Sequence, residues 1–115
     1  MHTYAATIAN IVDGDTLDAD IDLGFRITVR QRVRLHGIDA PELHGATAAA
    51  GKAAREYLKT ILAQRQTWTF RSMKPRDKYG RWLAIIYHYD EETNETTNVN
   101  RKMIEANHAT PFIDA

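Results

Sequence analysis

Apolar and basic residues alternate between positions 26 and 35 of this chain. One parity holds Ile27, Val29, Val33 and Leu35, and the other holds Arg26, Thr28, Arg30, Arg32 and Arg34. Successive side chains of a strand point to opposite faces, so this pattern is typical of a strand with one face in a core and the other in water. The pattern predicts a sheet, with Arg34 on the polar face near the end of the strand.

The segments on either side of this strand extend the β pattern. Further strands are predicted over residues 4–12, 16–21, 67–73 and 82–89, and Asp13-Gly14-Asp15 is a turn signal between the first two. Trp68 and Phe70 share one face of their strand and are expected in the core. Residues 90–97 are expected to form an acidic hairpin or loop.

Two helices are predicted between and after these strands. Apolar residues recur at three- and four-residue spacing from position 47 to 62, with Thr47 as the expected N-cap and Tyr57 on the packed stripe. Asn98 is expected to cap a short helix through Ala106, and Asn107 suits the left-handed position that follows.

Five strands with a helix after the third follow the order of an oligonucleotide-binding (OB) barrel. We therefore predict a mainly β fold of the α+β class, a five-stranded OB-fold barrel with a short C-terminal helix. The length of 115 residues fits one domain over residues 1–115.

Composition limits the chemistry that is open to the chain. It has no cysteine, so any metal would be held by oxygen or imidazole, which favours a hard cation. The residues after Met1 do not resemble a signal peptide, and no run of about 18 apolar residues could span a bilayer. We expect a cytoplasmic protein, or a secreted one if a signal peptide has been removed.

The charges are balanced in number but segregated along the chain. Fifteen basic and 15 acidic residues give a net charge of zero, which argues against a nucleic-acid binder that uses its whole surface. Acidic residues gather over 13–22 and 90–95, and basic residues over 26–34 and 71–81. This segregation predicts a local positive groove, and solvated faces are the alternative.

The segment from Arg34 to Glu42 reads Arg-Leu-His-Gly-Ile-Asp-Ala-Pro-Glu. Gly37 permits an unusual backbone and Pro41 restricts its neighbour, so Asp39 and Glu42 are expected in a stiff turn. Rigid carboxylates suit metal or acid–base chemistry, although an ordinary solvated turn would have the same composition.

Two other charged turns, over residues 13–16 and 77–81, could complete a site with this segment. Together the three segments supply several carboxylates and two arginines. Phosphodiester cleavage with a hard metal needs these groups, because carboxylates hold the cation, guanidiniums stabilise phosphoryl oxygens and a carboxylate can deprotonate water. The planar fork of arginine can donate twice to one phosphate.

The same segments resemble motifs of the staphylococcal nuclease (thermonuclease) family. The matching motifs are Val12-Asp13-Gly14-Asp15-Thr16, Val33-Arg34-Leu35-His36-Gly37-Ile38-Asp39-Ala40-Pro41-Glu42 and Asp77-Lys78-Tyr79-Gly80-Arg81, followed by Asn98-Val99-Asn100 and Ala109. The resemblance covers residues 5–110 in family order and spacing. It implies a calcium-dependent nuclease that hydrolyses the P–O5′ bond of single-stranded DNA or RNA and leaves 3′-phosphates.

The resemblance also implies a role for each matching position. Calcium would be bound by Asp15, Asp39 and the Ala40 carbonyl, and through water by Glu42, which would act as general base. Arg34 and Arg81 would grip the scissile phosphate, and Lys78 and Tyr79 would contact the neighbouring phosphate. Asp13 is expected to bond the amides of its own turn, and neither His36 nor His44 matches a family ligand.

Departures from the family pattern leave alternatives open. The family's C-terminal helix has no counterpart, so apolar surface near Met103, Phe112 and Ile113 predicts either a minimal monomer or a homodimer. The neutral charge predicts weaker, more salt-sensitive binding of substrate. A weak or inactive barrel that binds single-stranded nucleic acid is the alternative function, and a barrel with a purely structural or partner-binding role is a third.

Overall fold

The computed structural model describes residues 2–74 and 80–113. The strands are β1 (Thr3–Ile11), β2 (Thr16–Asp22), β3 (Thr28–Leu35), β4 (Ile38–Asp39), β5 (Thr67–Lys74), β6 (Trp82–Asp90), β7 (Glu95–Asn98) and β8 (Thr110–Pro111). The helices are η1 (Gly45–Thr47), a 3-10 turn, α1 (Ala48–Leu62) and α2 (Val99–Glu105). Each predicted long strand and both predicted helices are confirmed. The short β4 and β8 pair with each other and were not predicted.

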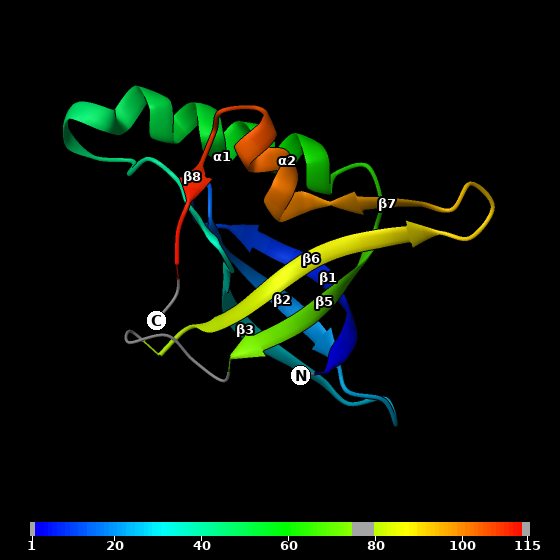
Figure 1. Cartoon of the computed structure of the whole chain (residues 1–115). Helices are drawn as coiled ribbons and strands as arrows, with labels where there is room; N and C mark the ends of the chain where they lie inside the picture. The colour runs from blue at the N-terminus through cyan, green and yellow to red at the C-terminus, as the bar shows by residue number, and fades with distance from the viewer. Residues whose placement is uncertain (1, 75–79, 114–115) are drawn as a thin grey trace.

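The five long strands close into a barrel. β1 pairs antiparallel with β2 and with β5, β2 pairs with β3, and β5 pairs with β6. A parallel pairing of β3 with β6 completes the circle, with Val33 opposite Trp82 and Leu35 opposite Ala84. This arrangement confirms the predicted OB-fold barrel (Figure 1).

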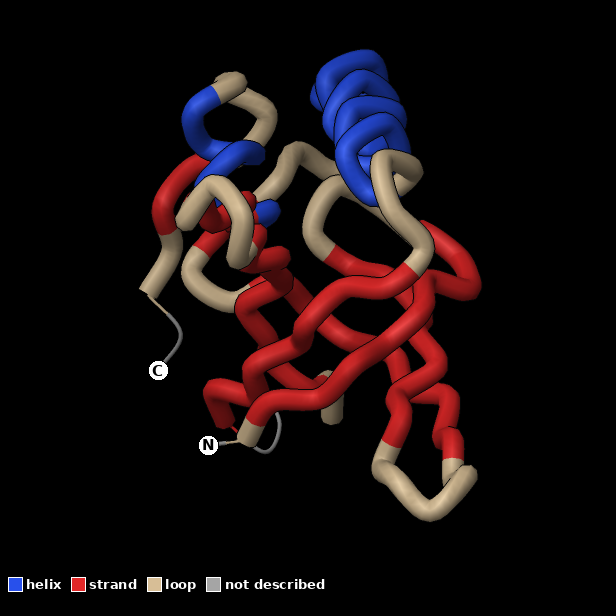
Figure 2. The backbone as a smooth tube through the Cα atoms, turned by 90° about the vertical axis from the view of Figure 1, so that its right-hand side faces the viewer, coloured by secondary structure: helices blue, strands red, loops and turns tan. Residues whose placement is uncertain are grey.

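Both helices lie at one end of the barrel (Figures 1 and 2). The apolar stripe of α1 places Ala54, Leu58 and Ile61 in the core. Trp68 is 1% exposed, and its indole N–H donates to the Leu62 carbonyl at 3.1 Å. The prediction that Trp68 is a core residue is therefore confirmed, and Phe70 and Tyr57 also pack into or against this core. Among the described helices, none is long and apolar enough to cross a membrane.

Two of the arginines expected in a positive groove, both on β3, are paired with aspartates, and residues 75–79 of the other basic run lie outside the described residues. Arg32 pairs with Asp18 and Arg30 with Asp20 across the β2–β3 ladder, each with a shortest N–O distance of 2.8 Å. The hydrogen bond from Arg32 lowers the pKa of Asp18, and the hydrogen bond from Arg30 lowers the pKa of Asp20. Residues that are separated in sequence as acidic and basic runs thus neutralise each other at this surface.

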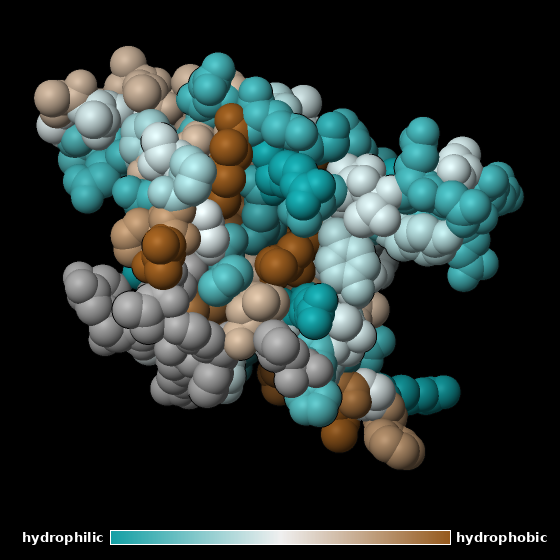
Figure 3. Space-filling view, in the orientation of Figure 1, coloured by the Kyte–Doolittle hydropathy of each residue, from teal (hydrophilic) through white to brown (hydrophobic). Residues whose placement is uncertain are grey.

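The hairpin between β2 and β3 carries an exposed apolar tip. Leu23, Phe25 and Ile27 are all exposed, Phe25 by 98%. Gly24, Phe25 and Arg26 have φ angles of 83°, 53° and 63°, so three successive residues of the turn have positive φ, and β3 begins only at Thr28. The space-filling view shows brown and tan atoms at this tip, at the lower right (Figure 3).

Helix α2 is fixed to the barrel through polar side chains at its first turn. Asn98 caps the helix as predicted, because its side chain accepts a hydrogen bond from the Arg101 amide. Asn107 has a φ of 61°, which confirms its left-handed position. Met103 is fully buried in the core, so the apolar surface expected near Met103, Phe112 and Ile113 is formed by Phe112 and Ile113, which are exposed.

Asn100 is the buried polar connection between α2 and the barrel. Its side-chain amide donates to the carbonyls of His36 and Ala84, and its oxygen accepts from the Ile86 amide at 3.0 Å. Replacing Asn100 by alanine should lower the free energy of unfolding by about 2–4 kcal/mol, because buried backbone groups lose their partners.

Urea unfolding of N100A and of the matched cap variant N98A tests this prediction. Loss of the cap should cost only about 1 kcal/mol. An N100A variant no less stable than N98A would contradict the role given to Asn100.

Candidate functional site

The turn between β1 and β2 holds Asp15 inside the protein. The Asp15 amide donates to the Asp13 carboxylate at 3.0 Å, which confirms the structural role predicted for Asp13. Asp15 itself is 7% exposed, and its Oδ1 accepts from the Thr16 hydroxyl at 3.1 Å. The Asp15 carbonyl accepts from the Leu35 amide, so the turn is bound to the end of β3.

Arg34 is also buried, at 6% exposure, and it meets Asp15 there. Its Nη2 lies 3.7 Å from Asp15 Oδ2 and 3.4 Å from Asp39 Oδ1, and it donates to the Ile38 carbonyl at 2.9 Å. The strand face predicted for Arg34 is right, since its side chain points away from the barrel core. The expectation of a solvated face is wrong at this position, because β4 and the residues after α2 cover it.

The segment after β4 closes this side of the site. The Ala40 amide donates to Asp15 Oδ2 at 2.9 Å, while the Asp39 side chain is 58% exposed. Two carboxylates that are far apart in sequence therefore flank one guanidinium, one of them deep and the other at the surface. The predicted convergence of Asp15, Arg34 and Asp39 is present.

The residues after α2 form a cover that sequence reasoning missed. β8 pairs with β4, with Asp39 opposite Thr110, and the Phe112 amide donates to the Gly37 carbonyl. The Phe112 ring lies over the Arg34 guanidinium, with Cζ 4.9 Å from the ring centroid. No local sequence pattern indicates this contact, because Phe112 is far from Arg34 in the sequence.

Close packing of α1 fixes the backbone next to Glu42. The Glu42 carbonyl accepts from the Thr47 hydroxyl at 3.0 Å, so Thr47 binds this carbonyl and makes no side-chain cap of its helix. A Cβ on Gly51 would lie 2.3 Å from the same carbonyl oxygen, so α1 reaches this distance only because residue 51 is glycine. The Glu42 side chain is exposed.

The remaining predicted site residues are only partly described. Arg81 is half-buried and immediately precedes β6. Lys78 and Tyr79 lie outside the described residues. His36 is half-buried and His44 is exposed.

The donor atoms at the site fit a hard cation. Carboxylate oxygens of Asp15 and Asp39 both lie within 3.7 Å of Arg34 Nη2, and no thiol is present in the chain. Within residues 2–74 and 80–113, no three carboxylate or imidazole side chains form a ready cluster. Burial raises the pKa of Asp15 to about 6, with help from the hydrogen bond and charge of Asp13, while the Ala40 amide and Arg34 oppose the shift.

Comparison with known proteins places this geometry in a family. Residues 32–113 match the family described as Staphylococcal nuclease homologue. The chain belongs to this family. It is 34% identical over 90 residues to a protein named Thermonuclease from Staphylococcus intermedius, a match that covers 76% of this chain and 51% of the relative. It is 29% identical over 91 residues to the Thermonuclease of Staphylococcus hyicus, with the same coverage. The chain thus spans about half the length of these two relatives.

Replacing Asp15 by asparagine should change the stability of this family member in a pH-dependent way when metal is absent, and the variant should gain relative to the parent as the pH rises. The pKa of Asp15 rises from 3.8 to about 6 on folding, so the carboxyl favours the folded state below pH 3.8 and this contribution is lost as the pH rises through 6. The difference in melting temperature, D15N minus parent, should therefore grow from about pH 4 to pH 6 and then level off. Thermal unfolding of both proteins in chelator across this pH range tests the prediction. A melting-temperature difference that does not change with pH would contradict the raised pKa of Asp15.

Replacing Gly51 by alanine should destabilise the protein, although alanine is the better helix former. The helix propensity gain is about 0.5–1 kcal/mol. Contact of the new Cβ with the backbone at Glu42 should cost about 1–3 kcal/mol, because a backbone cannot move aside as a flexible side chain can. Urea unfolding measures the balance. An increase in stability would mean that α1 can shift away from Glu42 without cost.

Proposed function

We propose that this chain is a calcium-dependent phosphodiesterase that cuts DNA or RNA at the P–O5′ bond and leaves 3′-phosphates. The observation that carries the proposal is the position of Arg34 Nη2, within 3.7 Å of Asp15 and 3.4 Å of Asp39. A buried guanidinium between two carboxylates is costly for stability and suits a site that binds both a cation and a phosphate. Membership of the family supports the same proposal.

Calcium would be held by Asp15, Asp39 and the carbonyl of Ala40. When bound, calcium supplies positive charge next to the phosphoryl oxygens. The Ala40 amide already donates to Asp15 Oδ2, so the backbone of Ala40 is fixed against the deep carboxylate. The exposed Asp39 side chain lies on the open side, where the substrate would enter.

Arg34 and Arg81 would grip the scissile phosphate from two strands. Arg34 is at the end of β3, and Arg81 precedes β6, whose first residues pair with that end. Arg34 is oriented by the Ile38 carbonyl and by the Phe112 ring, which limit the freedom of its side chain. Donors fixed in this way stabilise the charge that develops on phosphoryl oxygens during attack.

Glu42 would reach the cation through water and take the proton of the attacking water. Its carbonyl is fixed by Thr47 and packed against Gly51, while its side chain extends into solvent. A general base needs this combination of a fixed backbone and access to water. Lys78 and Tyr79 would contact the next phosphate of a single-stranded DNA or RNA substrate.

One chain supplies every residue in this proposal, so a monomer suffices. Phe112 and Ile113 are exposed and are the surface on which a homodimer would form. Arg30 and Arg32 are paired with aspartates, and the net charge of the chain is zero. Binding should therefore be weak at physiological salt.

The test is cutting of labelled single-stranded DNA in calcium and in chelator. The parent should cut only in calcium, and E42Q should be slower by about 10²–10⁴-fold because the water loses its base. Loss of a phosphate donor in R81A should cost about 10²–10³-fold. The substitutions E105Q and R101A at exposed positions of α2 serve as matched controls and should cut like the parent.

Two outcomes would sink this mechanism: no cutting by the parent in calcium, or undiminished cutting by both E42Q and R81A. If the parent instead binds the same DNA equally in calcium and in chelator without cutting it, the chain is a binding module.

A further inference from the structure

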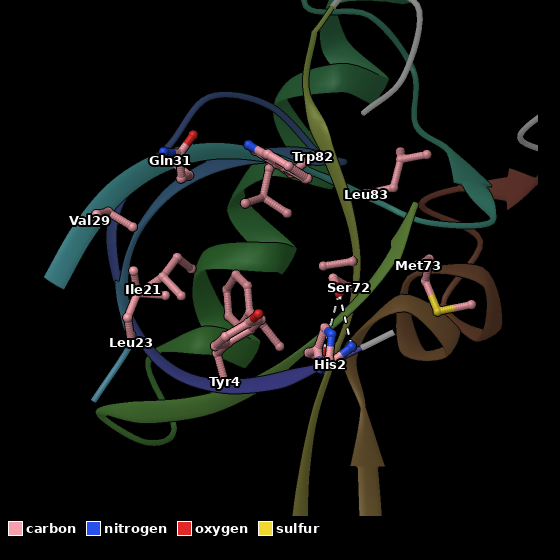
Figure 4. A pocket seen from close by; sticks show the side chains of 13 residues that line it. His2, Tyr4, Ile21, Leu23, Val29, Gln31, Ser72, Met73, Trp82 and Leu83 are labelled. Atoms are coloured by element: carbon pink, nitrogen blue, oxygen red, sulfur yellow. Dashed lines mark hydrogen bonds between the residues drawn. The ribbon is translucent and has the colours of Figure 1, made fainter. Parts of the chain in front are cut away.

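A cavity of about 490 Å³ opens into the barrel on the side away from α1. Its lining comes from the start of β1, the end of β2, alternate residues of β3, the end of β5 and the start of β6. The view into this cavity, the barrel mouth, shows side chains arranged around an open centre with α1 behind (Figure 4). Its volume is in the range of small-molecule pockets, which is about 300–1,000 Å³.

The lining is aromatic and aliphatic with a few polar groups. The rings of Tyr4 and Trp82 stand around the mouth together with Ile21 and Val29 (Figure 4). The ring of Phe70 also lines the cavity. Tyr4 and Trp82 are half-buried, so each combines a packed edge with a surface turned to the cavity. Aromatic walls of this kind favour a flat ring, because offset and edge-to-face contacts between rings add to the burial of apolar area.

Polar atoms at the mouth would orient such a ring. Gln31 lies between Val29 and Val33 on the same face of β3, and its amide offers both a donor and an acceptor. On the other side, Ser72 is fixed by His2: its hydroxyl accepts from the His2 amide at 3.2 Å and donates to the His2 carbonyl. A heteroaromatic ring with an amide or amidine edge matches the Gln31 amide.

The mouth adjoins the proposed phosphate site through the wall of the barrel. Val33 lines the mouth and pairs with Trp82, while the next pair along is Arg34 with Leu83. Successive side chains of a strand face opposite sides, so Val33 and Arg34 lie on the two faces of one wall. Arg81 directly precedes Trp82 at the rim.

We propose that the barrel mouth binds one planar heteroaromatic ring of nucleobase size. The ring stacks against Tyr4 and Trp82 and presents its polar edge to Gln31. It is supplied either by a free nucleoside or by a base of a single strand whose phosphate lies at Arg34 and Arg81. Only the second source rests on the proposed function.

Adenosine in calcium-free buffer is the first probe, and the readout is the change in tryptophan emission. The change reports Trp82, because Trp68 is buried in the core and contributes a constant background. Quenching should saturate in the millimolar to high-micromolar range that a ring of about ten heavy atoms can reach. V29F places a ring in the cavity and should weaken binding by about tenfold or more. Q31L keeps the shape of the wall, loses the amide hydrogen bonds and should weaken binding by up to about tenfold.

T28F is the matched control, because Thr28 precedes Val29 and is exposed on the other face of β3. It should bind adenosine like the parent. Absence of saturable quenching, or equal binding by V29F, Q31L and the parent, would overturn the proposal. If the Trp82 signal changes with protein concentration alone, and this change disappears in F25S, the hairpin tip of a second copy occupies the mouth. That result would also overturn the proposal.

A short single-stranded oligoadenylate in chelator separates the two sources. If a strand supplies the ring, the oligonucleotide should bind more tightly than adenosine, and abasic sites should remove the advantage. If the ring comes from a free nucleoside, the oligonucleotide should not compete with adenosine. These measurements need no cutting, so nuclease activity can fail without affecting them.

Discussion

The parallel pairing of β3 with β6 is the contact on which the rest of the arrangement depends. It joins Val33 to Trp82 and turns an antiparallel meander into a closed barrel. Closure gives the barrel two ends with different chemistry, one covered by α1 and α2 and the other open as an apolar mouth. It also gives the wall two faces with different neighbours, since Val33 packs inside while Arg34 meets Asp15 outside. A single ladder of hydrogen bonds therefore positions both the polar site and the cavity.

The polar site contributes little to stability by the usual measures. Removing Asp15 and Arg34 from water is expensive, and their attraction across 3.7 Å offsets the cost only because other bonds satisfy both groups. Asp15 accepts from Thr16 and from the Ala40 amide, and Arg34 donates to the Ile38 carbonyl. The raised pKa of Asp15 reflects the part of the desolvation cost that remains uncompensated. The apolar core around Trp68 and Leu58 supplies the stability that permits such a site.

Sequence reasoning succeeded where the physical cause is local. The period of two in β3 and the three- and four-residue spacing in α1 depend only on neighbouring residues, so the barrel strands and both helices could be predicted. It failed where the structure of the surface or the site depends on strand register or on contacts between residues distant in sequence. The aspartates of β2 and the arginines of β3 look like separate charge runs until register places Asp20 opposite Arg30. Phe112 lies far from Arg34 in sequence, so no local pattern could indicate that its ring covers the guanidinium.

The pairing of β4 with β8 bears on the order of events during synthesis. Asp15, Arg34 and Asp39 are made early, but the cover over them comes from Thr110 and Phe112, among the last described residues to leave the ribosome. Contacts between residues so distant in sequence form late, because a long loop must close before they contribute. Asp15, Arg34 and Asp39 are therefore all synthesised before residues 110–112, which complete the surroundings of Arg34.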